Sequence, residues 1–301
     1  MELTALGLLL LGALLAEPVS RVLADARWPS RDPVGALLIW QAVGLAGGLA
    51  LLGAGMVYGL APLGGSLVEA LAALPAAVDG GHLLSDLGAV RLLALLAAAA
   101  LAVRLVGVLT VTTVRTARAR RRHRDLLDVL GTPWPEAPGA RVLDHPVPVA
   151  YCLPGLRSRL VLSAGVLAAL SPAEVRAVLA HEQAHLRERH DLVVLPFVAW
   201  GETAPFVRGM VRAQVAVAAL IEMRADDVAA GATNAVDLSG ALRAVGGSAP
   251  AAALSSFTAA LDQRLARIAT PPPALPLPVR VLVRLAAPVL AVAPAIVALL
   301  V

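Results

Sequence analysis

Four apolar stretches, separated by one polar region, limit the fold of this 301-residue chain more than any other feature. Hydrophobic residues make up 58% of the sequence and charged residues only 15%, which is far from the average soluble protein. A helix of about 20 apolar residues crosses the hydrocarbon core of a bilayer. We therefore predict an integral membrane protein that is mainly α-helical. The expected spans are residues 3–16, 35–60, 90–111 and 281–301.

The first of these stretches is short for a span and would need flanking residues to cross. The second contains Gly44 and Gly48, whose spacing allows another helix to approach closely. Such spacings also arise by chance in sequences rich in glycine and alanine. A specific helix contact and a glycine-rich span without a specific partner both remain open here.

The distribution of arginine predicts the orientation, because cytoplasmic loops of membrane proteins carry an excess of positive charge. The third stretch is followed by a cluster of arginines: Arg115, Arg118, Arg120, Arg121, Arg122 and Arg124. Residues 61–88 contain no arginine and are expected to form an outside loop, whereas residues 17–33 carry three and are expected to form a cytoplasmic one. This places a cytoplasmic domain at residues 125–272 and both termini outside. We expect no direct binding of nucleic acid, because the sequence has no basic module interleaved with aromatic residues.

Arg104 and the apolar segment 192–200 do not follow the simple division into spans and loops. Arg104 lies inside the third stretch, where we expect it to extend toward the cytoplasmic interface. Residues 192–200 are apolar but interrupted by Pro196, so they are expected either in the core or against the bilayer.

The polar region begins with short β-strand patterns. Strands are expected at residues 141–144, 147–152 and 159–163. Prolines at 146, 148 and 154 flank or interrupt the second, and a central strand would not tolerate them, so it is expected at a sheet edge. Cys152 is the only cysteine, which excludes intrachain disulfides and a cysteine-based metal site, and we expect it to pack as a small residue.

A helix with a strong start signal follows the strands. Ser171, Pro172 and Glu174 have the spacing of an N-cap, a first-turn proline and a capping-box partner. The helix is expected to continue to about Arg189.

This helix carries His181, Glu182 and His185 in the pattern H-E-x-x-H. Two histidines four residues apart lie on one helix face, within reach of one divalent metal ion. The glutamate between them can act on a water molecule at that metal. In isolation the motif is short enough to occur by chance. The surrounding sequence must therefore show whether it forms a metal site.

A catalytic zinc takes three protein ligands and leaves one position open, so a third ligand is required. The downstream candidates are Glu202, Glu222, Asp226 and Asp227. Glu202 lies in a glycine- and proline-containing segment that suggests a turn. Glu222 follows an apolar helical run and is four residues before Asp226, so the pair offers one ligand and one carboxylate that can orient an imidazole. We therefore favour Glu222 as the ligand, Asp226 as the orienting group, and no role for Asp227.

Three further polar residues were weighed against ordinary structural roles. His190 could donate to an oxyanion but is expected to be a surface histidine at a helix end. Arg264 and Arg267 lie on a predicted helix near the last span and are expected to extend to, or pair with, lipid headgroups.

The motif His181-Glu182-x-x-His185, followed by Asp191 and by Glu222-x-x-Ala225-Asp226, resembles the integral-membrane gluzincin peptidases. These include HtpX-type proteases, CAAX prenyl endopeptidases and the BlaR/MecR-type antirepressor proteases, and the four-span layout is most similar to the last. The resemblance implies that the two histidines and Glu222 bind Zn²⁺, that Glu182 is the general base and that Asp226 lies beside the site. It also implies that an extended substrate lies along residues 147–152.

The resemblance implies a zinc endopeptidase that cleaves cytoplasmic or membrane-proximal proteins. A transcriptional repressor and a misfolded membrane protein are both open as substrates, and membrane lipids are expected around the spans. Receptors of the BlaR/MecR type have a penicillin-binding domain after the last span, which is not found here, so we do not expect β-lactam sensing. The alternative is a membrane signalling or scaffold protein whose metal site is structural or lost.

Overall fold

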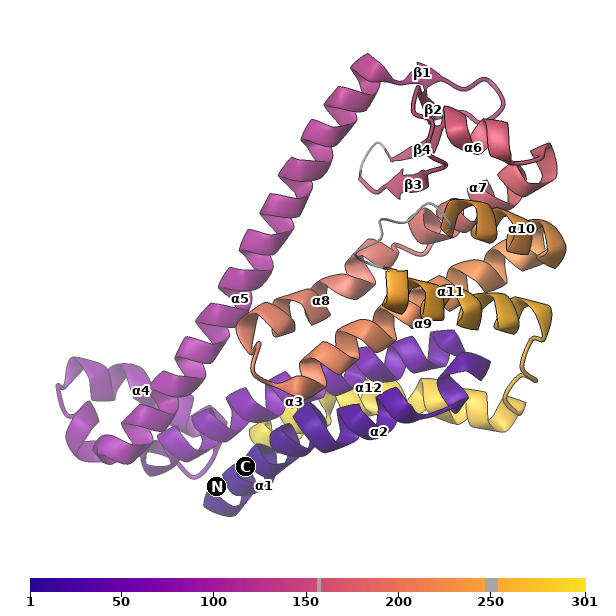
Figure 1. Cartoon of the computed structure of the whole chain (residues 1–301). Helices are drawn as coiled ribbons and strands as arrows, with labels where there is room; N and C mark the ends of the chain where they lie inside the picture. The colour runs from indigo at the N-terminus through magenta and orange to yellow at the C-terminus, as the bar shows by residue number, and fades with distance from the viewer. Residues whose placement is uncertain (156–157, 247–253) are drawn as a thin grey trace.

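A computed structural model describes residues 1–155, 158–246 and 254–301, and the side chains of all of these except 254–260. The chain is mostly helical, with a small mixed sheet at one end and both termini at the other (Figure 1). The α-helices of the first part are α1 (Glu2–Leu14), α2 (Ser20–Asp25), α3 (Pro33–Leu60), α4 (Leu67–Asp79) and α5 (Leu83–Leu130). Those that follow the sheet strands are α6 (Ala164–Ala169), α7 (Pro172–Arg187), α8 (His190–Thr203), α9 (Arg208–Ala232), α10 (Ala235–Gly246), α11 (Leu254–Ala269) and α12 (Leu277–Leu299).

Four helical segments are long and apolar enough to cross a membrane, which confirms the predicted number. They are Glu2–Asp25, Pro33–Leu63, Leu83–Leu130 and Leu277–Leu299. Helix α3 is the centre of this group, because it contacts α1, α5 and α12. Trp40 and Val57 of α3 are almost completely buried, one toward each end of the helix. The bundle therefore packs around α3.

The first helical segment is longer than expected, and the prediction of a loop at residues 17–33 is wrong for its first part. Pro18 would interrupt an α-helix because it has no backbone N–H. A single π-helical stretch, η1 (Leu15–Val19), surrounds this proline, and α2 continues beyond it. Glu17 is accommodated because its carboxylate accepts hydrogen bonds from Gly209 N at 2.7 Å and Arg212 Nη1 at 2.9 Å. The charge of Glu17 is thus satisfied by residues at the start of α9.

Residues 61–88 contain helix α4 and the start of α5 rather than a simple loop. Ser66 caps α4, since its hydroxyl accepts a hydrogen bond from Glu69 N at 3.2 Å. Gly88 has a φ of 74°, which breaks the regular backbone near the start of α5. From there the helix passes beyond the expected end at residue 111 and through the arginine cluster to Leu130. Arginine is a good helix former, so the cluster does not end the helix.

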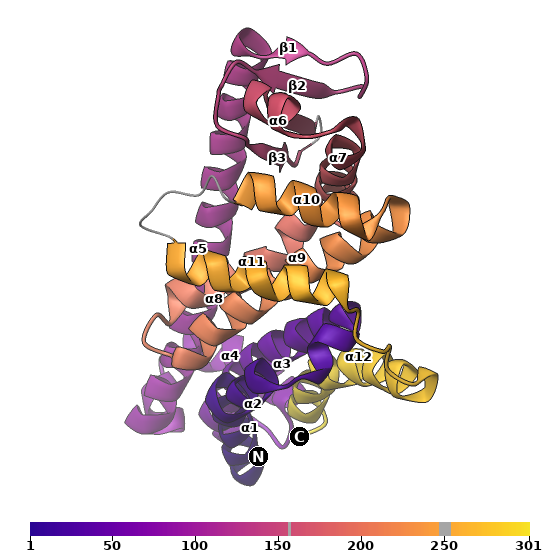
Figure 2. The ribbon, with the colours of Figure 1, turned by 45° about the vertical axis from the view of Figure 1, so that its right-hand side comes forward.

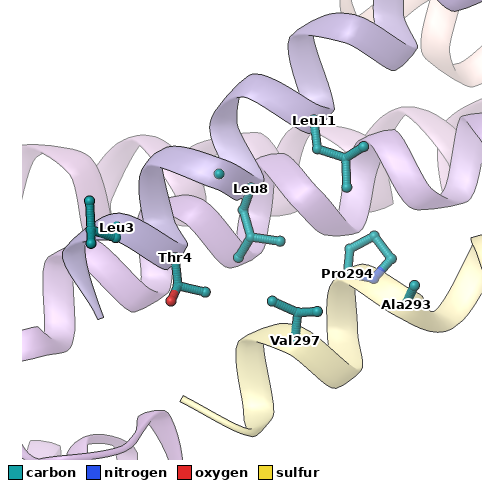
Figure 3. Close-up of a pocket in the computed structure, with 8 residues that line it drawn as sticks. Leu3, Thr4, Leu8, Leu11, Ala293, Pro294 and Val297 are labelled. Carbon is teal, nitrogen blue, oxygen red and sulfur yellow. The ribbon is translucent and has the colours of Figure 1, made fainter.

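Helices α1 and α12 leave an apolar groove of about 470 Å³ between them (Figure 3). The one polar side-chain atom among the labelled residues is the hydroxyl of Thr4. The groove is lined by Leu3, Thr4, Gly7, Leu8, Leu11, Ala293, Pro294 and Val297.

The sheet contains β1 (Thr132–Pro133), β2 (Ala140–Leu143), β3 (Ala150–Leu153) and β4 (Arg159–Ser163), in the order β1-β2-β4-β3. Strand β2 pairs with β4 in parallel, and β3 pairs with β4 antiparallel. The three expected strands are present, and β3 is an edge strand as the prolines predicted. The two-residue strand β1 was not expected. Figure 2 shows the sheet above α10 and α11, with α1, α2, α3 and α12 below them and α5 running from the lower part up to the sheet.

Helix α8 packs against α3 and α5 of the apolar bundle, which agrees with a core position for part of residues 192–200. Phe197 is 3% exposed and belongs to the same buried cluster as Trp40 of α3. A Cβ atom at Gly48 would lie 2.7 Å from Trp200 Cζ2. The glycine pair therefore makes a real helix contact, and its partner is α8. Arg104, which we expected to extend toward the cytoplasmic interface, donates hydrogen bonds to the carbonyls of Thr203 and Glu202 at the end of α8, each at 3.1 Å.

Candidate metal centre

His181 and His185 lie on one face of α7, as the spacing predicted. The capping box is formed, with Ser171 Oγ accepting from Glu174 N at 3.3 Å and Glu174 Oε2 accepting from Ser171 N at 2.8 Å. This capping box fixes the start of α7, which ends at Arg187, so His181 lies inside the helix and His185 lies in its last turn. Their Nε2 atoms lie 3.1 Å apart.

Glu222 reaches the same point from α9, which packs against α7. Its Oε2 lies 3.4 Å from His181 Nε2, and its Oε1 lies 3.5 Å from His185 Nε2. These three side chains form a group that could hold a metal ion. Glu202 does not join them, because it lies near the end of α8 and its carboxylate accepts a hydrogen bond from Thr112.

The three donors suit a tetrahedral zinc. Zn–N and Zn–O bonds of about 2.0–2.1 Å in tetrahedral geometry separate two donors by about 3.3 Å. The observed separations of 3.1, 3.4 and 3.5 Å bracket this value. The Glu222 side chain is 38% exposed, so the donors are reached from solvent on one side. Three ligands with an accessible fourth side are typical of catalytic rather than structural zinc sites.

The two imidazoles have different electrostatic surroundings. Burial lowers the pKa of His181, but the carboxylates of Asp226 and Glu222 outweigh it and raise this pKa to about 9. Burial and the neighbouring charges of His181, His190 and Arg264 lower the pKa of His185 to about 4. His185 is therefore neutral near pH 7, whereas His181 would have to release a proton to bind a metal ion.

Asp226 lies beside His181, on the side away from the other donors. Its Oδ1 is 3.1 Å from His181 Nδ1, a close contact whose angle falls short of an aligned hydrogen bond. The carboxylate is almost fully buried and accepts hydrogen bonds from Arg264 at 2.7 and 2.8 Å. Arg264 Nη1 also lies 3.0 Å from Glu222 Oε2. Burial raises the pKa values of both carboxyl groups, but Arg264 and His181 reverse the effect and hold them below their usual range.

The expectation that Arg264 and Arg267 pair with headgroups is wrong. Arg264 faces the candidate metal ligands. Arg267 donates to Asp227 at 2.5 and 3.0 Å and to the carbonyl of Ser30 at 3.1 Å. Asp227, to which we assigned no role, thus links α9 to α11.

A comparison with protein families gives one match, which covers the part of the chain that contains these donors. Residues 113–256 match the model of peptidase family M48. The match supports a metallopeptidase, and it does not distinguish the HtpX, CAAX and BlaR/MecR branches. No curated protein and no solved structure that was compared matches the chain.

Within the M48 match, Glu182 is a partly buried carboxyl group that follows His181 on α7. Burial raises its pKa, although the charge of His181 acts in the opposite direction. The Cys152 thiol of β3 lies beside this carboxylate, and burial and the Glu182 charge raise the thiol pKa well above its usual range. A thiol with a raised pKa is a poor nucleophile, in line with the packing role expected for Cys152.

The M48 region also contains a site residue that sequence reasoning missed. His190 was expected on the surface, but it is only 4% exposed. Its Nδ1 lies 2.9 Å from Nδ1 of His185. Arg189 has a left-handed backbone with a φ of 49°, which turns the chain so that His190 returns toward α7. The five-residue spacing between His185 and His190 does not predict this contact, because the contact depends on the left-handed turn at Arg189.

Proposed function

We propose that this protein is a membrane-embedded zinc endopeptidase. The observation that carries the proposal is the meeting of His181, His185 and Glu222 at separations suited to one zinc ion, with Glu182 on the same helix. The M48 match supports the same class of activity. Zinc is inferred from the donor set, because two imidazoles and one carboxylate in tetrahedral spacing are typical of zinc peptidases.

Each side chain has a distinct task in this proposal. His181, His185 and Glu222 hold the metal, and Asp226 orients the His181 ring. Zinc, when bound, polarises the scissile carbonyl and lowers the pKa of water at the site. Glu182 accepts a proton from the attacking water and later delivers it to the leaving amine. Burial raises its pKa above the usual value, which makes the carboxylate a stronger base toward that water.

Strand β3 is the proposed docking edge for the substrate. It pairs only with β4 in the described part of the sheet, which leaves its other edge available for an added strand. Cys152 of β3 lies beside Glu182, so a peptide paired with β3 would pass close to the general base. This supports cleavage of extended protein segments.

The substrates are proposed to be cytoplasmic or membrane-proximal proteins. The proposed orientation, with the domain at residues 125–272 on the cytoplasmic side and the termini outside, is supported by the arginine cluster that follows residue 111. A transcriptional repressor, as in the BlaR/MecR branch, and a misfolded membrane protein, as in the HtpX branch, remain the two proposed substrates. Membrane lipids surround the four spans, and the groove between α1 and α12 offers apolar surface to an acyl chain. A reporter fused after Arg124 tests the orientation, and an exterior signal would contradict it.

The catalytic assignment is tested with Glu182→Gln in the full-length protein. We expect casein hydrolysis to fall at least about a hundredfold, the usual loss when a general base is removed. Zinc content should stay at the parent level because Glu182 is not a ligand. Hydrolysis at the parent rate would refute the assignment. A zinc-loaded parent without any hydrolysis would instead favour a signalling or scaffold protein with a structural metal.

A further inference from the structure

A chain of side-chain contacts connects α9 to the candidate metal ligand His185. It consists of Arg224, Glu188, His190 and His185, in that order. Glu188 is the link between the two ends, since it contacts His190 on one side and Arg224 on the other. We propose that His190 is a positioning residue, and that Arg224, Glu188 and His190 together fix the ring of His185 for metal binding. This inference rests on the proposed metal site, but its test does not depend on hydrolysis.

His190 contacts polar groups through both of its ring nitrogens, which distinguishes it from a histidine that only fills space in the core. Its Nδ1 and that of His185 are 2.9 Å apart, and its Nε2 lies 3.3 Å from Glu188 Oε2. The His185 and His190 rings are nearly perpendicular, with an interplanar angle of 82°. Both nitrogens of this buried ring are therefore engaged.

These contacts define which nitrogen carries each proton. Arg224 lowers the pKa of Glu188, so its carboxylate is ionised and can only accept. His190 Nε2 must then donate, and in a neutral ring Nδ1 accepts. The Nδ1 of His185 is the donor in that bond, which leaves the lone pair on its Nε2 for the metal. Hydrogen bonding at the non-ligating nitrogen is how proteins set the tautomer of a metal-bound histidine.

Arg224 anchors the far end of this chain of contacts on α9. Its Nη2 donates to Glu188 Oε1 at 2.6 Å, and its Nε donates to Oε2 at 2.9 Å. Arg224 is two residues from Glu222, so the same helix that supplies the third donor also holds the partner of His185. The chain of contacts thereby couples the position of α7 to that of α9.

The two candidate ligand histidines are supported by different chemistry. His181 faces the carboxylate of Asp226, whereas His185 faces the imidazole of His190. Removal of His190 would leave His185 free to rotate or to adopt the other tautomer. The loss should therefore appear in metal affinity and ligand geometry, not only in stability.

The test compares His190→Asn with His190→Leu in the full-length protein. Asparagine carries an oxygen at the position of Nδ1 and can still accept from His185, whereas leucine fills similar volume without an acceptor. We expect His190→Leu to weaken zinc binding by about 10–100-fold in competition with a chromophoric chelator. The Asn variant should recover most of this loss. Cobalt substitution gives a second readout, because the visible spectrum of Co²⁺ should change in the Leu variant and stay near the parent form in the Asn variant.

A second variant covers the case in which His190→Leu does not fold. Glu188→Leu touches neither candidate ligand histidine, and it should weaken zinc binding in the same direction, whereas Glu188→Gln keeps an acceptor for His190 and should have a smaller effect. Parent-like zinc affinity and cobalt spectrum in the Leu variants would overturn the proposal. Equal losses in His190→Asn and His190→Leu would overturn it as well. Retained hydrolysis in Glu182→Gln would instead refute the catalytic assignment and leave the positioning role intact.

Discussion

Arg264 donates two hydrogen bonds to the carboxylate of Asp226, at 2.7 and 2.8 Å, in a pair that is largely shielded from solvent. Replacement of Arg264 by leucine would leave a buried carboxylate without its main partner. Breaking a buried ion pair in this way costs about 3–5 kcal/mol. We expect Arg264→Leu to lower the free energy of unfolding by this amount, measured by denaturant titration of the metal-free protein in detergent.

Arg141→Leu is the matched control for this prediction. Arg141 lies 3.0 Å from Asp128, whose side chain is 43% exposed and which also pairs with Arg159. An exposed pair of this kind contributes at most about 1 kcal/mol. If Arg264→Leu and Arg141→Leu had the same free energy of unfolding, the pair of Arg264 with the buried Asp226 carboxylate would not contribute the expected stability.

The contrast between Asp226 and its partner shows which part of the site could be predicted from the sequence. The placement of Glu222 and Asp226 on one helix face follows from a four-residue spacing, which is local. Arg264 is 38 residues beyond Asp226, and no local pattern indicates that α11 turns its arginine toward the site. The buried position of His190 could not be predicted for a related reason, because the left-handed residue Arg189 redirects the chain just before it.

The distinction between local patterns and contacts distant in sequence also explains which parts of the fold could be predicted. Long apolar runs such as α3 predict their own helices, since length and composition are sufficient. The helix through Glu17 was mistaken for a loop because its charge is satisfied only by the distant Gly209 and Arg212. Local polarity therefore gave the wrong boundary wherever a tertiary partner supplied the compensation.

Gly48 is required for the contact between α3 and α8. An added Cβ would lie 2.7 Å from Trp200 Cζ2 there, whereas at Gly44 the nearest atoms are at 3.9 Å. Overpacking costs about 1–3 kcal/mol and should outweigh the roughly 1 kcal/mol that alanine adds to a helix. We expect Gly48→Ala to unfold at a lower temperature than the parent and Gly44→Ala at an equal or higher one, followed by tryptophan fluorescence. A lower unfolding temperature for Gly44→Ala alone would contradict this packing.

Asp191 should make stability depend on pH. Burial raises its pKa, but hydrogen bonds from Arg120, at 2.8 Å, and Arg189 lower it below its usual value. The stabilisation is therefore complete above the unfolded pKa of about 4 and is lost as pH falls through the lower folded value. We expect Asp191→Asn to be less stable than the parent by about 1–3 kcal/mol near neutral pH, with the difference shrinking in acid. Unfolding curves recorded across this range test the prediction, and a difference that is independent of pH would exclude the ion pair as its cause.

Metal removal should destabilise the protein, because the three donors come from α7 and α9 and one ion would link both helices. A ligand present at about 100 times its dissociation constant stabilises the folded state by about 2.7 kcal/mol. We expect a chelator to lower the unfolding temperature of the zinc-loaded parent, and added zinc to restore it. His185→Ala removes one donor and should abolish most of this shift, whereas Glu182→Gln should keep it. An identical chelator response in the parent and in His185→Ala would mean that the stabilising metal binds elsewhere, since loss of a ligand must weaken binding at the site that contains it.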